Sequence, residues 1–230
     1  MVRVTFCSFL SASLLGLVVG CSSGDESLVL HEGGGYEYEA TGPGVVVYPS
    51  GPYGRDVGST VRNFKFAGFL NPLEADYTAS EDTIFTIRFS DYYNPDGDPG
   101  RPVALLVNAS ALWCPVCRQE AAASKKAYND ENGVEFRGWR ERGVEFITAI
   151  FEDEETNPAQ FVHIESWSKQ YSLEYPVVLD PRLTLGVFFD QSASPFNMII
   201  DTRTMKIVYA AEGYVDIGQN NSVLQSLTEQ

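Results

Sequence analysis

Residues 102–128 contain the feature that most limits how this chain can fold. The segment begins with the continuous apolar run PVALLVNA (102–109) and ends in the alanine-rich stretch CPVCRQEAAASKKAY, which contains Cys114 and Cys117. A continuous apolar run that ends in turn-compatible residues is typical of a strand buried on both faces. The residues after it favour a helix, with Pro115 in its first turn. The sequence therefore predicts a buried strand, a short turn and a helix that begins at the cysteine pair.

Further segments predict a sheet around that unit. Residues up to about 69 should lead into the domain as loop and edge strand. Four more segments have the composition of strands: 82–89, 143–151, 196–201 and 206–213. Asn157 as cap and Pro158 at the first position predict a second helix, and a short helical segment is expected near 183–188. This order predicts an α/β domain over residues 50–230, with a central mixed sheet covered on both faces by helices.

The N-terminus is expected to direct the protein out of the cytoplasm. Arg3 supplies an early positive charge, residues 6–19 form a short apolar run, and the small Gly20 precedes Cys21. This order is typical of a secretory signal peptide, and the apolar run is short for a membrane-spanning helix. The tetrapeptide VVGC also resembles the lipobox of bacterial lipoproteins. That resemblance implies that residues 1–20 are removed and that Cys21 becomes a lipid anchor on a bacterial membrane, facing the periplasm or the cell exterior.

Composition sets further limits on the mature protein. Residues 21–49 are rich in glycine, serine and acid without a sustained period, which predicts a flexible tether between the lipid and the domain. Hydrophobic residues at 44% and charged residues at 20% are ordinary for a globular protein. The net charge of −15 argues against a nucleic-acid partner, because phosphate binding requires clustered lysine and arginine.

Cys114 and Cys117 are the only cysteines expected to remain as thiols after export. Cys7 would leave with the signal peptide, and Cys21 would be acylated. A zinc site needs four ligands, but the chain offers no further cysteine and only 2 histidines, so no metal is expected. A copper carrier would prefer a wider cysteine spacing. A structural disulfide would close too short a loop to stabilise the fold much, which favours a redox centre.

The position of the pair at a helix start suits redox chemistry. The first sulfur would meet free backbone N–H groups and the positive end of the helix dipole, and both favour the thiolate. We therefore expect Cys114 to be the exposed nucleophile that attacks a partner disulfide. Cys117, one turn further along and more buried, would resolve the resulting mixed disulfide.

The segment VALLVNASALWCPVCRQE resembles the active-site segment of the thioredoxin superfamily, and specifically that of TlpA/ResA-type redoxins. Asn108 stands where this subgroup often has Asn, and Glu120 matches its active-site Glu. The segment SPFNMIID, which begins with Ser194 and Pro195, resembles the cis-proline loop and the strand after it. The resemblance implies a thioredoxin-like three-layer α/β/α sandwich.

The resemblance also implies roles for individual residues. Glu120 would accept a proton beside the second cysteine, although an ordinary solvated helix residue is the alternative. Asn108 would tune the thiols or simply cap a strand end. Trp113 would pack beside the site and shape access to it. A cis-Pro195 would leave the backbone of Ser194 free to pair with an extended substrate segment.

The implied function is that of a membrane-anchored, extracytoplasmic thiol–disulfide oxidoreductase. It would exchange electrons with protein thiols, protein disulfides and a redox partner protein, with no cofactor beyond the Cys114–Cys117 disulfide. Two alternatives stay open. A peroxiredoxin-like peroxidase would want a PxxxTxxC pattern, which this chain lacks, and a non-enzymatic surface binding module would use the disulfide only as a staple. The sequence leaves the direction of electron flow open.

Overall fold

The chain divides into two units, Met1–Val45 and Val46–Gln230. The computed structural model describes residues 26–30, 36–40, 47–129, 138–215 and 222–229. The signal peptide predicted for residues 1–20 and the lipid site predicted at Cys21 lie outside the described residues. Among the described residues, no helix is both long and apolar enough to cross a membrane.

The first unit contains a short antiparallel strand pair. Strand β1 (Glu26–Leu30) pairs with β2 (Tyr36–Ala40), and Leu28 lies opposite Tyr38. The sequence analysis predicted no regular element in this segment. Each strand has only five residues, and only β2 alternates aromatic with acidic residues, so the strand pattern is too brief to stand out from the surrounding glycine-rich sequence.

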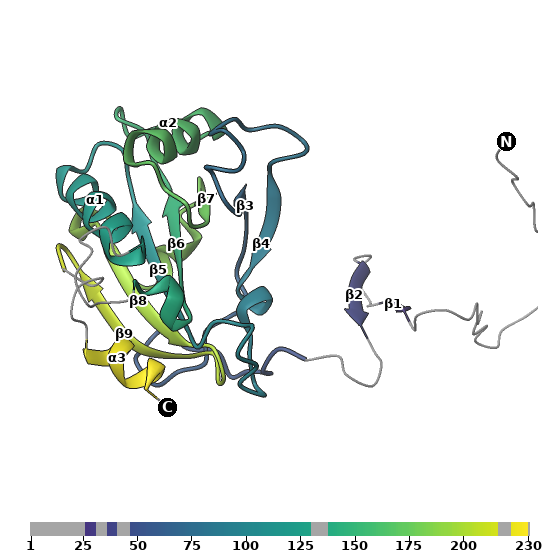
Figure 1. The fold of residues 1–230 in the computed structure, drawn as a ribbon. Coiled ribbons are helices and arrows are strands. Elements are labelled where there is room, and N and C mark those ends of the chain that lie inside the picture. Colours follow the sequence, from purple (N-terminus) through teal and green to yellow (C-terminus); the bar gives the residue numbers. More distant parts are fainter. Residues whose placement is uncertain (1–25, 31–35, 41–46, 130–137, 216–221, 230) are drawn as a thin grey trace, which may run out of the picture. The chain divides into compact units, whose positions relative to one another are not determined.

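The second unit is built on a seven-stranded sheet with the order β4-β3-β7-β6-β5-β8-β9, which runs from right to left in Figure 1. The strands are β3 (Lys65–Phe69), β4 (Phe85–Arg88), β5 (Ala104–Ser110), β6 (Val144–Ile150), β7 (Val177–Leu179), β8 (Phe196–Asp201) and β9 (Lys206–Glu212). The pairs β5–β6 and β6–β7 are parallel, and the other neighbours are antiparallel. The predicted central mixed sheet is therefore confirmed.

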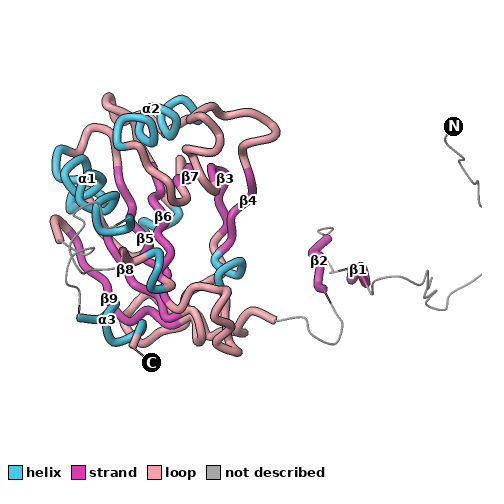
Figure 2. Tube along the Cα trace, in the orientation of Figure 1, coloured by secondary structure: helices cyan, strands magenta, loops and turns pink. Residues whose placement is uncertain are grey.

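Helices and long loops connect these strands. The α-helices are α1 (Pro115–Asn129), α2 (Phe161–Tyr171) and α3 (Ser222–Thr228). Short 3₁₀ helices are η1 (Phe89–Tyr92), η2 (Arg140–Arg142), η3 (Thr184–Val187) and η4 (Gln191–Ala193). Figure 2 shows that loop segments rather than helices join β3 to β4 and β8 to β9.

Three features of the structure differ from the prediction: the position of one strand, an additional strand and the start of one helix. The expected edge strand is β3, which lies inside the sheet because β4 and β7 pair with its two sides. The short strand β7 was not predicted as a strand. Helix α2 begins at Phe161 and not at Pro158. Asn157 is not its cap. The backbone N–H of Asn157 donates to the Asp153 carboxylate at 2.8 Å, and Pro158 forms an isolated β-bridge with Glu152.

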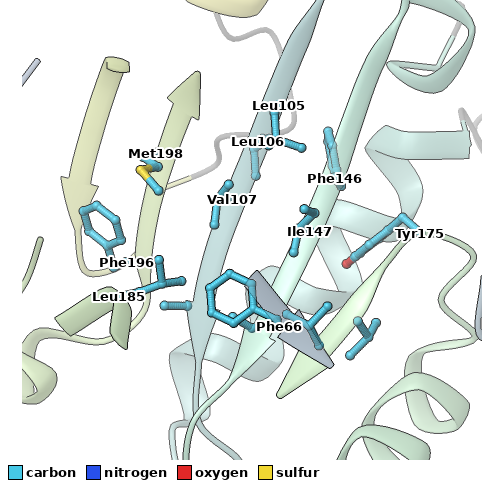
Figure 3. Packing of buried hydrophobic residues seen from close by; sticks show 14 of the residues in the cluster. Phe66, Leu105, Leu106, Val107, Phe146, Ile147, Tyr175, Leu185, Phe196 and Met198 are labelled. Atoms are coloured by element: carbon cyan, nitrogen blue, oxygen red, sulfur yellow. The ribbon is translucent and has the colours of Figure 1, made fainter. Parts of the chain in front are cut away.

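The two faces of the sheet carry different side chains. On one face, Val107, Ile147 and Met198 are register neighbours, and Phe66 and Leu185 belong to the same buried cluster (Figure 3). Burial of such apolar side chains is the main force that holds a domain of this size together. The opposite face of β5 and β8 meets helix α1 and carries polar residues at its centre, which positions the site described next.

Candidate functional site

The cysteine pair lies at the start of α1, as predicted: Cys114 directly precedes the helix and Cys117 is in its first turn. Cys114 and Cys117 form a disulfide, with their Cα atoms 5.3 Å apart. The Cys117 N–H donates to Cys114 Sγ at 3.1 Å, so a backbone amide of the first helical turn faces the first sulfur. Such amides favour a negative charge on that sulfur when the disulfide opens.

The expected exposure of Cys114 is wrong for this disulfide form. Cys114 is 2% exposed and Cys117 is 0% exposed. The backbone carbonyl oxygen of Ser194 lies 3.6 Å from Cys114 Sγ, so the segment before β8 lies against the sulfur. A contact between residues 80 positions apart in the chain cannot be read from the local pattern around the cysteines.

The segment before β8 contains the predicted cis bond. The Ser194–Pro195 peptide is cis, and Pro195 is buried. The N–H of Ser194 is not free, however. It donates to the Gln191 carbonyl at 3.3 Å, and the Ser194 hydroxyl donates to the same oxygen at 2.7 Å. The turn η4 thus uses one of the two backbone groups of Ser194, the residue whose backbone was expected to be free to pair with a substrate segment.

A buried polar network lies on the α1 face of the sheet. The amide nitrogen of Asn108 donates to Glu120 at 2.9 Å and to the amide oxygen of Asn197 at 2.9 Å. Asn197 Nδ2 donates to both carboxylate oxygens of Glu120, at 3.1 and 2.9 Å. The backbone N–H of Val215 adds a further bond of 2.8 Å to Glu120, and the Ser110 hydroxyl donates to Asn108. Asn108 and Asn197 are direct register partners on β5 and β8.

This network decides two questions that the sequence left open. Glu120 is 3% exposed, so it is not an ordinary solvated helix residue. Asn108 lies within β5 and bonds across to α1 and β8, so it does not simply cap a strand end. Glu120 lies one helical turn beyond Cys117. Asn108, Asn197 and Val215 all donate hydrogen bonds to its carboxylate oxygens.

Trp113 connects the site to a second carboxylate at the surface. Its indole N–H donates to Glu152 Oε2 at 2.8 Å, and Gln191 Nε2 donates to Glu152 Oε1 at 2.6 Å. The Arg118 guanidinium donates through Nε to the Leu112 carbonyl at 3.0 Å, on the same turn. Trp113 is therefore held in place beside Cys114.

Sequence reasoning missed Asn197, Glu152 and Gln191. Asn197 is a polar residue that interrupts the apolar part of β8, two positions after Pro195, and that interruption is a signal that could have identified it. Glu152 belongs to the acidic run EDEE (152–155), and nothing near it in the sequence indicates that it reaches Trp113 and Gln191. Gln191 carries no local signal at all.

The turn that precedes Ser194 is stabilised by a carboxylate. Asp190 caps η4 by accepting the Ser192 hydroxyl at 2.7 Å and the Ser192 N–H at 2.9 Å. These two hydrogen bonds lower the pKa of Asp190 below its ordinary value. The ionised Asp190 carboxylate therefore stabilises η4 when the pH is above the ordinary pKa of an aspartate. This stabilisation is lost as the pH falls through the lowered pKa.

Comparison with known proteins identifies the fold. No family model matches the sequence, and no curated protein matches it. An uncharacterized conserved protein from Geobacillus kaustophilus matches with a TM-score of 0.54 and 17% identity, over 76% of this chain and 83% of that one. A Chlorobium tepidum protein, provisionally named thiol:disulfide interchange protein DsbE, matches with 0.51 and 15%, over 76% and 96%.

A Neisseria meningitidis protein, provisionally named a thioredoxin, matches with a TM-score of 0.50 and 16% identity, over 74% of this chain and 91% of that one. These similarities cover about three quarters of this chain and agree with the mixed sheet of its second unit. The second unit of this chain therefore has a thioredoxin-like α/β fold.

Proposed function

We propose that this protein is a thiol–disulfide oxidoreductase that acts on protein substrates through Cys114 and Cys117. One observation carries the proposal: Cys114, just before α1, forms a disulfide with Cys117 in the first turn of α1, beside the cis-Pro195 segment. The named relatives of similar fold, a thioredoxin and a thiol:disulfide interchange protein, support this assignment.

The reaction proceeds in two exchanges that balance in atoms and electrons. In the reduced protein, the Cys114 thiolate attacks one sulfur of a substrate disulfide and forms a mixed disulfide, and the other substrate sulfur leaves as a thiolate that takes up a proton. The Cys117 thiol then loses its proton, and its sulfur attacks Cys114 Sγ and releases the second substrate thiol. The substrate gains two electrons, and the protein is left with the Cys114–Cys117 disulfide. The reverse sequence oxidises a substrate dithiol.

Glu120 is the candidate acceptor for the proton of Cys117. Its carboxylate is buried one turn from that residue and is oriented by Asn108 and Asn197. A fixed carboxylate can take the proton as the Cys117 sulfur attacks.

We further propose that the protein acts outside the cytoplasm, attached to the membrane through lipid on Cys21. The VVGC motif and the tether that follows it support this proposal. Export would also place the cysteine pair in an oxidising compartment, where a disulfide persists. Incorporation of labelled fatty acid into the wild type, and its loss in Cys21→Ala, is the expected result. Equal labelling of both proteins would contradict lipidation at this residue.

Insulin reduction tests the enzymatic activity. The wild type should accelerate reduction of insulin by a small dithiol, and Cys114→Ser should abolish the acceleration because the nucleophile is gone. Cys117→Ser should instead accumulate mixed disulfides with its partners, visible on non-reducing gels. Cys21→Ser is the matched control, since it removes a cysteine outside the thioredoxin-like unit and should leave insulin reduction unchanged. Wild-type activity equal to that of Cys114→Ser would contradict the assignment.

A structural disulfide is the second candidate, and the burial of both cysteines favours it. The exposures of 2% and 0% are what a staple in a binding module would show. The two candidates differ in reactivity, because a redox-active disulfide must be reduced readily by dithiols. Rapid alkylation of both sulfurs after mild dithiothreitol treatment supports the oxidoreductase, and resistance to such treatment supports the staple.

A further inference from the structure

Glu152 joins the two chain segments that flank Cys114. It lies two residues after the end of β6, and its side chain is half-buried. One carboxylate oxygen accepts the Trp113 indole N–H at 2.8 Å, and the other accepts Gln191 Nε2 at 2.6 Å. A single side chain therefore links the residue before the nucleophile to the turn before the cis-proline.

The backbone around Glu152 is itself fixed. Its carbonyl accepts the Leu112 N–H at 2.9 Å, and the residue forms a β-bridge with Pro158. The next residue, Asp153, closes the loop behind it by accepting the backbone N–H groups of Glu155 and Asn157 at 3.0 and 2.8 Å. The carboxylate of Glu152 is thus presented from a rigid support, which is what a positioning residue requires.

The contact with Gln191 extends to the sulfur of Cys114. The Gln191 carbonyl accepts both the N–H and the hydroxyl of Ser194. The Ser194 carbonyl in turn lies 3.6 Å from Cys114 Sγ. Three successive contacts therefore connect Glu152 to the sulfur of Cys114, and the Trp113 indole is held by the same carboxylate.

We propose that Glu152 is a positioning residue for substrate recognition, which holds Trp113 and residues 191–195 as the two fixed sides of the surface that a protein substrate contacts. The inference rests on the oxidoreductase function proposed above and goes beyond it, because it separates recognition from sulfur chemistry. Glu152 acts through Trp113 and Gln191 and takes no part in the exchange of sulfur bonds. Its partner class is a protein disulfide that is large enough to contact both sides at once.

Loss of this link should affect large and small substrates differently. Without Glu152, the Trp113 ring and the η4 turn must be ordered again by each protein substrate, which weakens binding. A small disulfide that reaches only the sulfur does not depend on that order. For Glu152→Ala, kcat/KM for insulin should fall about tenfold, mainly through KM, as expected for loss of two charge-assisted hydrogen bonds. Reaction with a small aromatic disulfide should change by less than about twofold, since its contacts are unaffected.

Glu152→Gln separates hydrogen bonding from charge. The Gln oxygen can still accept the Trp113 N–H, and its NH₂ can donate to Gln191 once the Gln191 amide has turned over. This variant should therefore recover insulin kcat/KM to within about threefold of the wild type. Glu154→Ala is the matched control, because it removes the same charge from an exposed side chain of the same acidic run and should leave both substrates unaffected.

Tryptophan fluorescence provides a readout of the link itself. The chain has 3 tryptophans, and Trp139 and Trp167 are 0% and 2% exposed, so quenching by acrylamide reports mainly on Trp113. Glu152→Ala should increase quenching, whereas Glu152→Gln should not. If Glu152→Ala fails to fold, Gln191→Leu removes one of the two contacts alone and should still raise the KM for insulin without slowing the small disulfide.

The outcomes distinguish the two proposals. An active wild type combined with an unchanged insulin KM in Glu152→Ala, or with equal losses on both substrates, overturns the role of Glu152 alone. A wild type that reacts with neither substrate faster than Cys114→Ser overturns the oxidoreductase assignment, and the inference falls with it. A selective loss on insulin that Glu152→Gln reverses supports the inference.

Discussion

Two carboxylates flank the disulfide, and their surroundings differ sharply. Glu120 is 3% exposed and accepts hydrogen bonds from Asn108, Asn197 and Val215, inside the layer between α1 and the sheet. Glu152 lies at the surface and accepts from Trp113 and Gln191, both on segments that flank Cys114. Glu120 lies one helical turn from Cys117, and Glu152 contacts the two segments that we propose a protein substrate meets. The same residue type thus occupies two different environments beside the disulfide, one buried and one partly exposed.

The largest effect is expected where the inner network is broken. Asn197→Leu leaves the buried Glu120 carboxylate without the Asn197 amide and should destabilise the fold by about 2–4 kcal/mol. Glu152→Ala, at the half-exposed outer site, should lower stability by about 1 kcal/mol or less. Urea unfolding measures both. Met198→Leu, on the next residue and the opposite face, is the control and should change stability by less than about 1.5 kcal/mol. Equal losses at the inner and outer sites would remove the contrast.

The second prediction concerns the chemistry assigned to the inner carboxylate. Glu120→Gln should slow resolution of the mixed disulfide by about tenfold near neutral pH, because the acceptor for the Cys117 proton is lost. The difference from the wild type should shrink as the pH rises, since the thiol then ionises without help. Single-turnover kinetics across a pH series measures this change. Glu120→Asp keeps a carboxylate and should retain part of the rate. A slowing that is the same at every pH would contradict the role as proton acceptor.

A smaller effect is expected when only the hydrogen bond from Trp113 to Glu152 is removed. Trp113→Phe keeps an aromatic ring but removes the N–H, and should raise the KM for insulin by about threefold. The rise should be smaller than in Glu152→Ala, because the Gln191 contact remains. Adding Glu152→Ala to Trp113→Phe should produce less than the sum of the two separate effects, because the two residues share one contact. Strict additivity would show that Trp113 and Glu152 act independently.

The smallest effect is a local titration of the outer turn. The Ser192 hydrogen bonds lower the pKa of Asp190, so the midpoint should lie below the ordinary value of 3.8. The stabilising contribution of the carboxylate is present above that value and is lost as the pH falls through the lowered pKa. The amide resonance of Ser192 should follow this titration in an NMR series, and Asp190→Asn should abolish it. A midpoint at or above the ordinary value would contradict the cap.

Local sequence patterns predicted much of the fold. The strand before the cysteines, helix α1 and strands β6, β8 and β9 all follow from apolar runs and helix-forming composition. The disulfide and the cis bond at Pro195 were expected from their surroundings and from the family resemblance. Asn108 and Glu120 were expected to belong to the site, but Asn197, which bonds to both, was not identified.

Long-range contacts were beyond the reach of these patterns. Asn197 meets Asn108 only because β5 and β8 pair in one particular register. Glu152 meets Gln191 across 39 positions of sequence. The low exposure of Cys114 and the occupied Ser194 amide both arise from the η4 turn, which no local signal indicated. The sequence thus indicated the cysteines and Glu120 as candidate site residues. Their hydrogen-bond partners from distant segments became known only from the fold.

The reduction potential of the Cys114–Cys117 pair decides whether this disulfide is redox-active, as we propose, or structural. It can be measured on the whole chain by equilibration with mixtures of reduced and oxidised dithiothreitol, followed by alkylation and mass spectrometry. A redox-active pair should have a potential between about −120 and −270 mV, the range of known thiol–disulfide oxidoreductases. A potential below about −300 mV, with sulfurs that resist reduction, would identify a structural disulfide and contradict the account.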